Sequence, residues 1–197
     1  MFNDEELEKV KIKALEDHVP IVMDDSLEVI KQILIDNNPK RILEIGTAVG
    51  YSASQFVRYA GEQFEKVDTI ELDEERAKEA IDNIEKIGIS NKINVIIGNA
   101  VDVLPTLNEK YDMIFIDANK GKYPIFLQEA IRLSKKGSVI VADNILYKGY
   151  VMSDYNKHKQ RTAVRHLREY IAEALENPAL DTKILEVGDG LAISKVK

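Results

Sequence analysis

The 197-residue sequence has no cysteine and only five prolines and ten glycines. The absence of cysteine excludes disulfide bonds, thiol nucleophiles and thiolate metal ligands, so a metal site would have to use oxygen or imidazole ligands. The three histidines, His18, His158 and His166, are scattered, a spacing that does not indicate zinc. No proline- or glycine-rich stretch marks a boundary. We therefore predict one domain over residues 1–197, with 1–20 as an N-terminal helical extension.

Long apolar runs are also absent. Apolar residues make up 45% of the chain and charged residues 31%, proportions that are typical of a globular protein. No run approaches the length of a membrane span, and the amphipathic start, MFNDEELEKVKIKALEDH, lacks the apolar centre of a secretion signal. The sequence predicts a cytoplasmic protein that makes no use of a membrane.

The formal charge of −7 is unfavourable for coating nucleic acid, because phosphate binding needs a local excess of lysine and arginine. One such excess exists between Tyr147 and Arg168, where Asp154 is the single acid. At about 100° per residue, the arginines of this stretch form one stripe of a helix beside an apolar stripe. The basic stripe is either a phosphate-binding face or a solvated one. Its candidate binding residues are Lys148, Lys159, Arg161, Arg165 and Arg168.

Short β-rich apolar runs alternate with helical patterns, which predicts a parallel sheet with crossover helices. In the helix Glu74–Ile87, for example, Ala77, Ala80, Ile81 and Ile84 share one face. The predicted parallel strands are Arg41–Ile45, Lys66–Glu71, Ile93–Ile97, Tyr111–Asp117 and Ser138–Ala142.

The order changes near the C-terminus, where a helix near Thr162–Leu175 precedes two strands, Lys183–Val187 and Leu191–Val196. The turn Gly188-Asp189-Gly190 between the strands is typical of a hairpin. We expect an α/β, Rossmann-like fold with a mostly parallel seven-stranded sheet, a C-terminal antiparallel hairpin and helices on both faces.

A glycine-containing stretch, LEIGTAVGYS, follows the first strand and opens a helix. Gly46 and Gly50 let the backbone approach a ligand, and a helix N-terminus offers N–H donors. A Rossmann dehydrogenase binds pyrophosphate at such a turn with the spacing G-x-G-x-x-G, whereas the spacing here is E-x-G-x-x-x-G. Glu44 is unfavourable beside a pyrophosphate and favourable beside a cationic amino acid. The pattern therefore favours S-adenosylmethionine over NAD.

The next two strand ends carry further candidates for a nucleotide site. Glu71 ends the second strand, where a carboxylate accepts both ribose hydroxyls in NAD and S-adenosylmethionine sites alike. Gly98, Asn99 and Ala100 follow the third strand, where an adenine ring would lie, although Gly-Asn is also an ordinary loop dipeptide. An NAD-dependent dehydrogenase is therefore the alternative from a different class.

Oxygen ligands follow the fourth and fifth strands. Asp117 ends one strand and Asp143-Asn144 follows the other, so the three side chains are expected to meet at the carboxyl edge of the sheet. Two carboxylates and an amide suit Mg²⁺, Mn²⁺ or Ca²⁺. Lys120 would point to the same place and help to deprotonate an acceptor hydroxyl. A helix-capping role for each aspartate and an exposed position for the lysine are the simpler alternatives.

These residues together resemble the cation-dependent O-methyltransferase family that includes catechol and caffeoyl-CoA O-methyltransferases. The resemblance runs from about Pro20 to the C-terminus and implies a class I S-adenosylmethionine-dependent methyltransferase that forms a homodimer. It implies that Asp117, Asp143 and Asn144 bind the metal, and that Lys120, with Asp117, is catalytic. For the cofactor it implies Ser52 at the methionine carboxylate, Met23 nearby, and Asn99 and Ala100 beside adenine. Asp117 is expected to contact the cofactor as well as the metal.

Within this family, the stretches DANKGKYP and GDGLA and the basic segment resemble most the bacterial tRNA 5-hydroxyuridine methyltransferases. That resemblance implies formation of 5-methoxyuridine at the wobble position of the anticodon loop. The 5-hydroxyl and the 4-oxo oxygen are neighbours that could chelate a metal, and an unpaired base can be turned into a pocket. Asn119 departs from the acid of plant members, whose substrate-binding insertion is not apparent. The alternative acceptor is a small catechol-type molecule with two neighbouring oxygens.

Overall fold

The computed structural model describes residues 2–154 and 160–197. Seven strands of the described chain form one sheet in the order β3-β2-β1-β4-β5-β7-β6. The strands β1 to β5 are parallel, whereas β7 is antiparallel to both β5 and β6. The predicted sheet with its terminal hairpin is therefore confirmed. The strands are β1 (Arg41–Ile45), β2 (Lys66–Glu71), β3 (Ile93–Ile97), β4 (Tyr111–Ile116), β5 (Ser134–Ala142), β6 (Leu180–Leu185) and β7 (Leu191–Val196).

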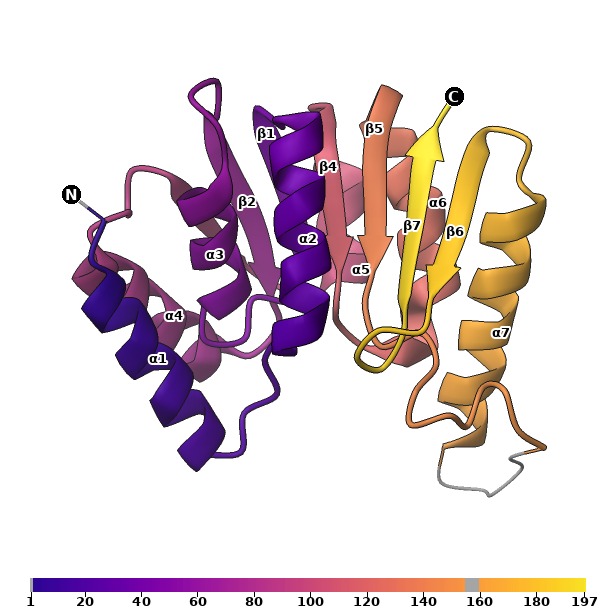
Figure 1. The fold of residues 1–197 in the computed structure, drawn as a ribbon, viewed down its shortest axis with the longest axis horizontal. Helices are drawn as coiled ribbons and strands as arrows, with labels where there is room; N and C mark the ends of the chain where they lie inside the picture. Colours follow the sequence, from indigo (N-terminus) through magenta and orange to yellow (C-terminus); the bar gives the residue numbers. More distant parts are fainter. Residues whose placement is uncertain (1, 155–159) are drawn as a thin grey trace.

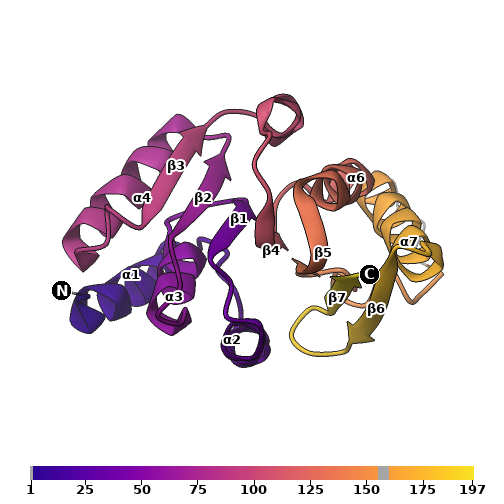
Figure 2. The ribbon, with the colours of Figure 1, turned by 90° about the horizontal axis from the view of Figure 1, so that it is seen from above.

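Helices cover both faces of the sheet, as predicted (Figures 1 and 2). One face carries α1 (Asp4–Glu16), α2 (Asp24–Asn37), α3 (Tyr51–Tyr59) and α4 (Glu74–Ile87). The other carries α5 (Ala100–Val103), α6 (Tyr123–Leu133) and α7 (Arg161–Glu176). Two short 3-10 turns, η1 (Leu104–Thr106) and η2 (Lys120–Lys122), complete the described helical segments.

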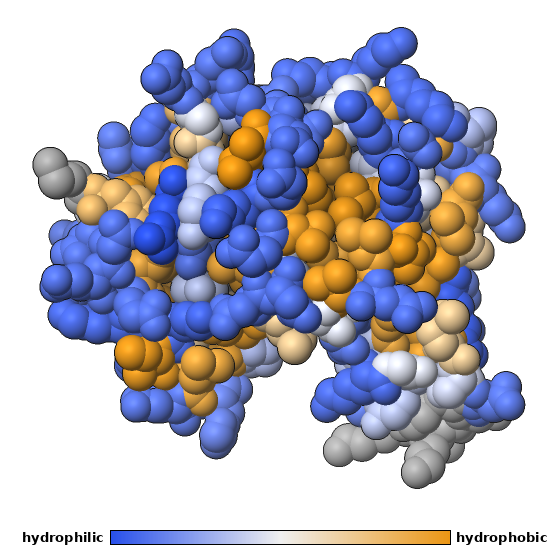
Figure 3. Space-filling view, in the orientation of Figure 1, coloured by the Kyte–Doolittle hydropathy of each residue, from blue (hydrophilic) through white to orange (hydrophobic). Residues whose placement is uncertain are grey.

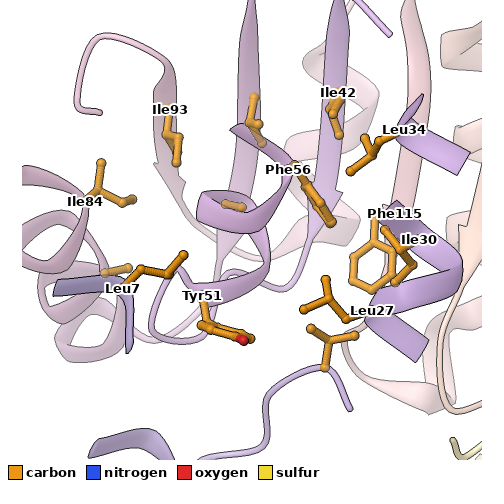
Figure 4. Close-up of a cluster of buried hydrophobic side chains, with 14 of the residues drawn as sticks. Leu7, Leu27, Ile30, Leu34, Ile42, Tyr51, Phe56, Ile84, Ile93 and Phe115 are labelled. Atoms are coloured by element: carbon orange, nitrogen blue, oxygen red, sulfur yellow. The ribbon is translucent and has the colours of Figure 1, made fainter. Parts of the chain in front are cut away.

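Each face has its own apolar core. In the core under α1 to α4, the rings of Phe56 and Phe115 meet edge to face with their centroids 5.3 Å apart, close to Ile30 of α2 (Figure 4). Leu7 of α1 is also buried here. Burial of such side chains contributes roughly 1.5–3 kcal/mol each, so the N-terminal helix is part of the folded core.

The boundaries of α4 follow from its ends. The Asp73 side chain accepts a hydrogen bond from the Arg76 amide at 2.9 Å, and Gly88 ends the helix with a φ of 82°. The prediction that Ile81 shares the buried face is wrong, since this side chain is 43% exposed. The centre of the buried stripe lies nearer Ile84, which leaves Ile81 about 60° away at its edge.

Some predicted strand limits are also wrong. β6 begins at Leu180, which pairs with Val196, and it ends at Leu185. Val187 belongs to the turn instead, where its carbonyl accepts a hydrogen bond from the Gly190 amide. β5 begins four residues earlier than predicted, at Ser134, because the exposed Lys135 and Lys136 hide the start of the strand from a search for apolar runs.

Part of the sheet is left open on the side of α1 to α4. In Figure 1, no helix of the described chain lies in front of β7 and β6, and Figure 3 shows apolar side chains over this region. Leu185 and Ile193 are partly buried there against the core. We call this uncovered side of β6 and β7, which includes Leu185 and Ile193, the open sheet face.

No helix among the described residues combines the length and apolar character needed to cross a bilayer.

Candidate active site

Backbone hydrogen bonds bring the ends of four parallel strands to one edge of the sheet. The Asp117 amide donates to the Ile45 carbonyl at 2.9 Å, and the Asp143 amide donates to the Ile116 carbonyl at 3.0 Å. The Gly46 amide donates to the Ile70 carbonyl near the end of β2 at 3.0 Å. The strand order reverses at the pair β1 and β4, which is where open α/β sheets bind ligands.

A cavity of about 330 Å³ lies over the ends of β1, β2 and β3. Its walls include six residues predicted for the cofactor site, namely Gly46, Glu71, Gly98, Asn99, Ala100 and Asp117. Leu72 and Phe126 also line it but were missed from the sequence. Leu72 is 68% exposed, and an apolar side chain in a polar strand-end loop is the signal that could have found it.

The Glu71 carboxylate is held by the loops on both sides of this cavity. One oxygen accepts from the Ala48 amide at 2.8 Å, and the other accepts from the Asp73 amide at 3.0 Å. Each oxygen keeps a further lone pair, as ribose hydroxyl binding would require.

A second cavity, of about 260 Å³, shares Gly46, Ala48, Asp117 and Ala118 with the first. The two cavities therefore adjoin, and we call them together the cleft. The predicted Ser52, Lys120 and Asn144 line the second cavity, together with the segment Pro20–Val22. Met23, which was expected near the cofactor, is outside this lining and 49% exposed.

Glu44 is completely buried and lies outside the lining of both cavities among the described residues. Its carboxylate accepts hydrogen bonds from the hydroxyls of Ser52 and Thr69. Burial raises the pKa of Glu44 to about 8. Ser52, which donates to this carboxylate, lines the cleft, and Glu44 itself does not. The sequence had suggested that Glu44 attracts a cationic ligand directly.

The two glycines of the loop after β1 have different roles. A side chain at Gly46 would place Cβ 2.1 Å from the Asp117 carbonyl oxygen, and the φ of Gly46 is +107°. Gly50 faces the opposite way, toward Ala80 and Ile84 of α4. Gly46 therefore shapes the cleft, while Gly50 is required by its φ of +79° at the start of α3.

The predicted metal ligands lie together. The Lys120 ammonium is 3.0 Å from the Asn144 side-chain oxygen and 3.6 Å from an Asp117 carboxylate oxygen. Asp143 is fully buried; one carboxylate oxygen accepts from the Asn144 amide, and the other has no hydrogen-bond partner within the described chain. Burial raises the pKa of Asp143 to about 7 and also raises that of Asp117.

These donors fit a hard divalent cation. The unpartnered Asp143 oxygen is a buried acceptor without a donor in the described part of the chain, and the Lys120 ammonium lies as a cation beside Asp117 and Asn144. Carboxylate and amide oxygens are the preferred donors of Mg²⁺, Mn²⁺ and Ca²⁺. No group of three or more histidines, cysteines or acids with metal-binding spacing occurs in residues 2–154 and 160–197, so a metal here depends on the amide of Asn144.

Aromatic rings border the same place. The Lys120 ammonium lies 5.8 Å from the centre of the Tyr123 ring and 6.0 Å from that of Tyr147. Sequence patterns did not single out these tyrosines, because Tyr123 lies in the buried start of α6 and Tyr147 in an irregular loop.

The structure divides the predicted basic stripe. Arg161 and Arg165 are exposed near the start of α7. Arg165 directly precedes His166, whose ring faces Gly121 of η2. Arg168 donates instead to its own chain, to the carbonyls of Val151 at 3.0 Å and Ser153 at 2.5 Å. Lys148 is exposed, and Lys159 lies outside the described residues.

Comparison with known proteins gives consistent matches. A family model described as O-methyltransferase matches residues 3–197. A catechol O-methyltransferase from Niastella koreensis is 38% identical over 167 residues, which cover 80% of this chain and 74% of the relative. An O-methyltransferase from Bacillus cereus, solved with S-adenosylhomocysteine, has a TM-score of 0.88 and 28% identity, covering 99% and 92% of the two chains. A Staphylococcus aureus structure, provisionally named a caffeoyl-CoA O-methyltransferase, has a TM-score of 0.90 and 36% identity, covering 97% and 92%.

Proposed function

We propose that a divalent metal assists the reaction of this chain, which belongs to the O-methyltransferase family. The chain is an S-adenosylmethionine-dependent O-methyltransferase of the catechol and caffeoyl-CoA type. The observation that carries the proposal is the position of Asp117 and Asn144 around the Lys120 ammonium, together with the unpartnered carboxylate oxygen of Asp143, the residue before Asn144. A metal held by two acids and an amide keeps positions for two neighbouring oxygens of an acceptor.

The chain's own residues supply binding and charge. When bound, the metal acts as a Lewis acid that lowers the pKa of the acceptor hydroxyl. Lys120 places a positive charge where the acceptor oxygen becomes an anion and stabilises it. Glu71 and Ser52 orient the two ends of the cofactor, so that the C–S bond breaks as the new C–O bond forms in line.

Removal of the metal tests this function. Dialysis against a chelator is expected to abolish methyl transfer, and Mg²⁺ or Mn²⁺ to restore it. Asp117→Ala is expected to lose at least about a hundredfold in kcat/KM, because a charged ligand is missing. Asp82→Ala, which removes an exposed acid of α4, serves as the matched control. Full activity in the chelated enzyme would refute the metal requirement.

We propose a small molecule with two neighbouring oxygens, such as a catechol, as the acceptor. The similarity to catechol O-methyltransferases supports this class of substrate. Methylation of a simple catechol by the purified enzyme, followed by mass spectrometry, is the direct measurement. An inactive preparation that still binds S-adenosylhomocysteine would exclude this acceptor.

The second candidate acceptor is 5-hydroxyuridine in a tRNA anticodon loop. It is favoured by the exposed Arg161 and Arg165 of α7, the helix that packs against the turn carrying Lys120. Charge reversal at these two arginines is expected to reduce methylation of hydroxyuridine-containing tRNA at least tenfold and to leave catechol methylation unchanged. Lys78→Glu with Lys86→Glu, an equal charge change on the exposed surface of α4, is the control. Equal activity of both proteins on tRNA would reject this acceptor.

We also propose that the protein forms a homodimer through the open sheet face. Leu185 and Ile193 are apolar there, and charges of both signs, Asp181 and Lys183, stand on the same edge strand. A two-fold axis can therefore pair apolar with apolar and acid with base. Ile193→Arg is expected to give monomers in sedimentation experiments. The control Ile125→Arg, on the opposite face, should not. A monomeric wild-type protein would refute the dimer.

A further inference from the structure

The loop that carries Asn144 has an unusual backbone. Asn144, Tyr147 and Lys148 have φ angles of 55°, 45° and 57°, in the left-handed region that residues with a side chain rarely adopt. Three such residues within five positions do not hold their conformation by local preference. The surrounding structure must therefore fix this loop, which we call the Asn144–Lys148 loop.

The fixing partner is the hairpin turn between β6 and β7. The Ile145 amide donates to the Gly190 carbonyl at 3.0 Å, and the Leu146 amide donates to the Asp189 carbonyl at 2.9 Å. The Lys148 amide donates to a carboxylate oxygen of Asp189. The first two bonds use only the backbone of the turn, whereas the third requires the side chain at position 189.

The same turn is anchored on its other side. The Gly188 amide donates to a carboxylate oxygen of Asp25 at 3.0 Å, and a Cβ at Gly188 would lie 2.3 Å from the Ser26 hydroxyl. Asp25 and Ser26 form the start of α2, directly after the Pro20–Val22 wall of the second cavity. The turn therefore links the Asn144–Lys148 loop to the start of α2 through hydrogen bonds on both of its sides.

We propose that Asp189 is a positioning residue, whose carboxylate holds the Lys148 amide and so keeps the Asn144–Lys148 loop in the shape that presents the Asn144 oxygen to a divalent cation. The proposal rests on the proposed metal-assisted function. Asp189 touches neither cofactor nor acceptor in this account. It acts on the ligand through the backbone, as residues behind metal ligands commonly do.

Metal binding in the absence of substrate tests this role. Binding of Mn²⁺ to the wild type, Asp189→Ala and Asp189→Asn is measured by electron paramagnetic resonance, and binding of S-adenosylhomocysteine by calorimetry without metal. We expect D189A to bind Mn²⁺ about tenfold more weakly, the lower end of the range for such partners, with unchanged S-adenosylhomocysteine affinity. D189N should bind within about twofold of the wild type, because its amide oxygen still accepts from Lys148.

Matched variants separate the explanations. Asp181→Ala removes an exposed acid from the same hairpin at its far end and should change neither affinity. If D189A does not fold, Asp189→Glu, whose carboxylate is displaced by one methylene, replaces it with the same expected loss. D189N as weak as D189A would show that charge rather than the hydrogen bond acts, and would overturn the proposal.

The proposal and the function on which it rests fail in different ways. Wild-type protein that binds no Mn²⁺ overturns both of them. Wild-type protein that binds Mn²⁺ while D189A binds it equally well overturns only the role of Asp189. Parallel loss of Mn²⁺ and S-adenosylhomocysteine affinity in D189A would indicate general damage to the fold and would also overturn that role.

Discussion

At the scale of single residues, Gly46 places the strictest demand on the sequence. Its absent side chain lets the loop after β1 approach the Asp117 carbonyl, and its φ of +107° is unfavourable for any other residue. Gly46→Ala is therefore expected to lower the free energy of unfolding by about 2–5 kcal/mol, through strain and overpacking together. Urea denaturation measures the loss.

Gly137→Ala is the matched control for Gly46→Ala. Gly137 also has a positive φ, of +88°, but a Cβ there meets nothing within 4 Å among the described residues. Gly137→Ala should therefore lower the free energy of unfolding only through backbone strain, by about 1–2 kcal/mol. Equal losses in the two variants would show that the contact with Asp117 is not tight.

Glu44 should make stability depend on pH. Burial raises the pKa of Glu44 to about 8 in the folded protein, from an ordinary value of 4.5. Between these values the folded state keeps a proton that the unfolded state has released, so stability falls as pH rises through this window. Glu44→Gln removes the effect.

The melting temperature at pH 6 and pH 9 tests this prediction for Glu44. The melting temperature of E44Q minus that of the wild type should be larger at pH 9 than at pH 6. The same difference for Glu62→Gln, an exposed residue, should not change with pH. A constant difference between E44Q and wild type would indicate that Glu44 is ionised throughout.

Sequence patterns located individual residues well where the backbone alone decides the position. Asp117, Asp143 and Asn144 meet because parallel strands end at one edge, and periodicity predicts those strands. The orientation of Glu44 could not be predicted, since it depends on Ser52 and Thr69 from two other elements. The partners of Arg168 were equally hidden, because they are carbonyls of a distant loop.

At the scale of elements, α1 is expected to stabilise the fold rather than to act as a detachable arm. Leu7 is 1% exposed against α3 and α4, whereas Ile12 on the same helix is 49% exposed. Leu7→Ala should cost about 2–4 kcal/mol of unfolding free energy, and Ile12→Ala under about 0.5 kcal/mol. Thermal denaturation compares them, and similar losses would contradict this packing.

Element types could be predicted more reliably than element ends. The spacing of apolar residues predicts the alternation of strands and helices, and the turn at 188–190 predicts the hairpin. The limits of β6 could not be derived in this way, because Leu180 and Asp181 become strand only by pairing with Val196 and Lys195. Pairing partners are set by tertiary structure and leave no local pattern.

At the scale of the whole molecule, the cofactor should act as a stabilising ligand. S-adenosylhomocysteine at 100 times its Kd is expected to stabilise the fold by about 2.7 kcal/mol, which raises the melting temperature by roughly 5–10 °C for a domain of this size. NAD at the same concentration should give no shift. A shift with NAD would contradict the selectivity of the cofactor site, and Glu71→Ala should weaken the response to S-adenosylhomocysteine.

The order of strands in the sheet also bears on how such a protein can change over time. The loops after β2 and β3 line only the first cavity, and the loop after β5 and the segment Pro20–Val22 line only the second, whereas the loops after β1 and β4 line both. Donor and acceptor would thus share the loops after β1 and β4, while each cavity also has loops of its own. Changes in the loop after β5 or in Pro20–Val22 can alter the second cavity while the loops after β2 and β3 stay unchanged, a separation that suits relatives named after both catechols and caffeoyl-CoA.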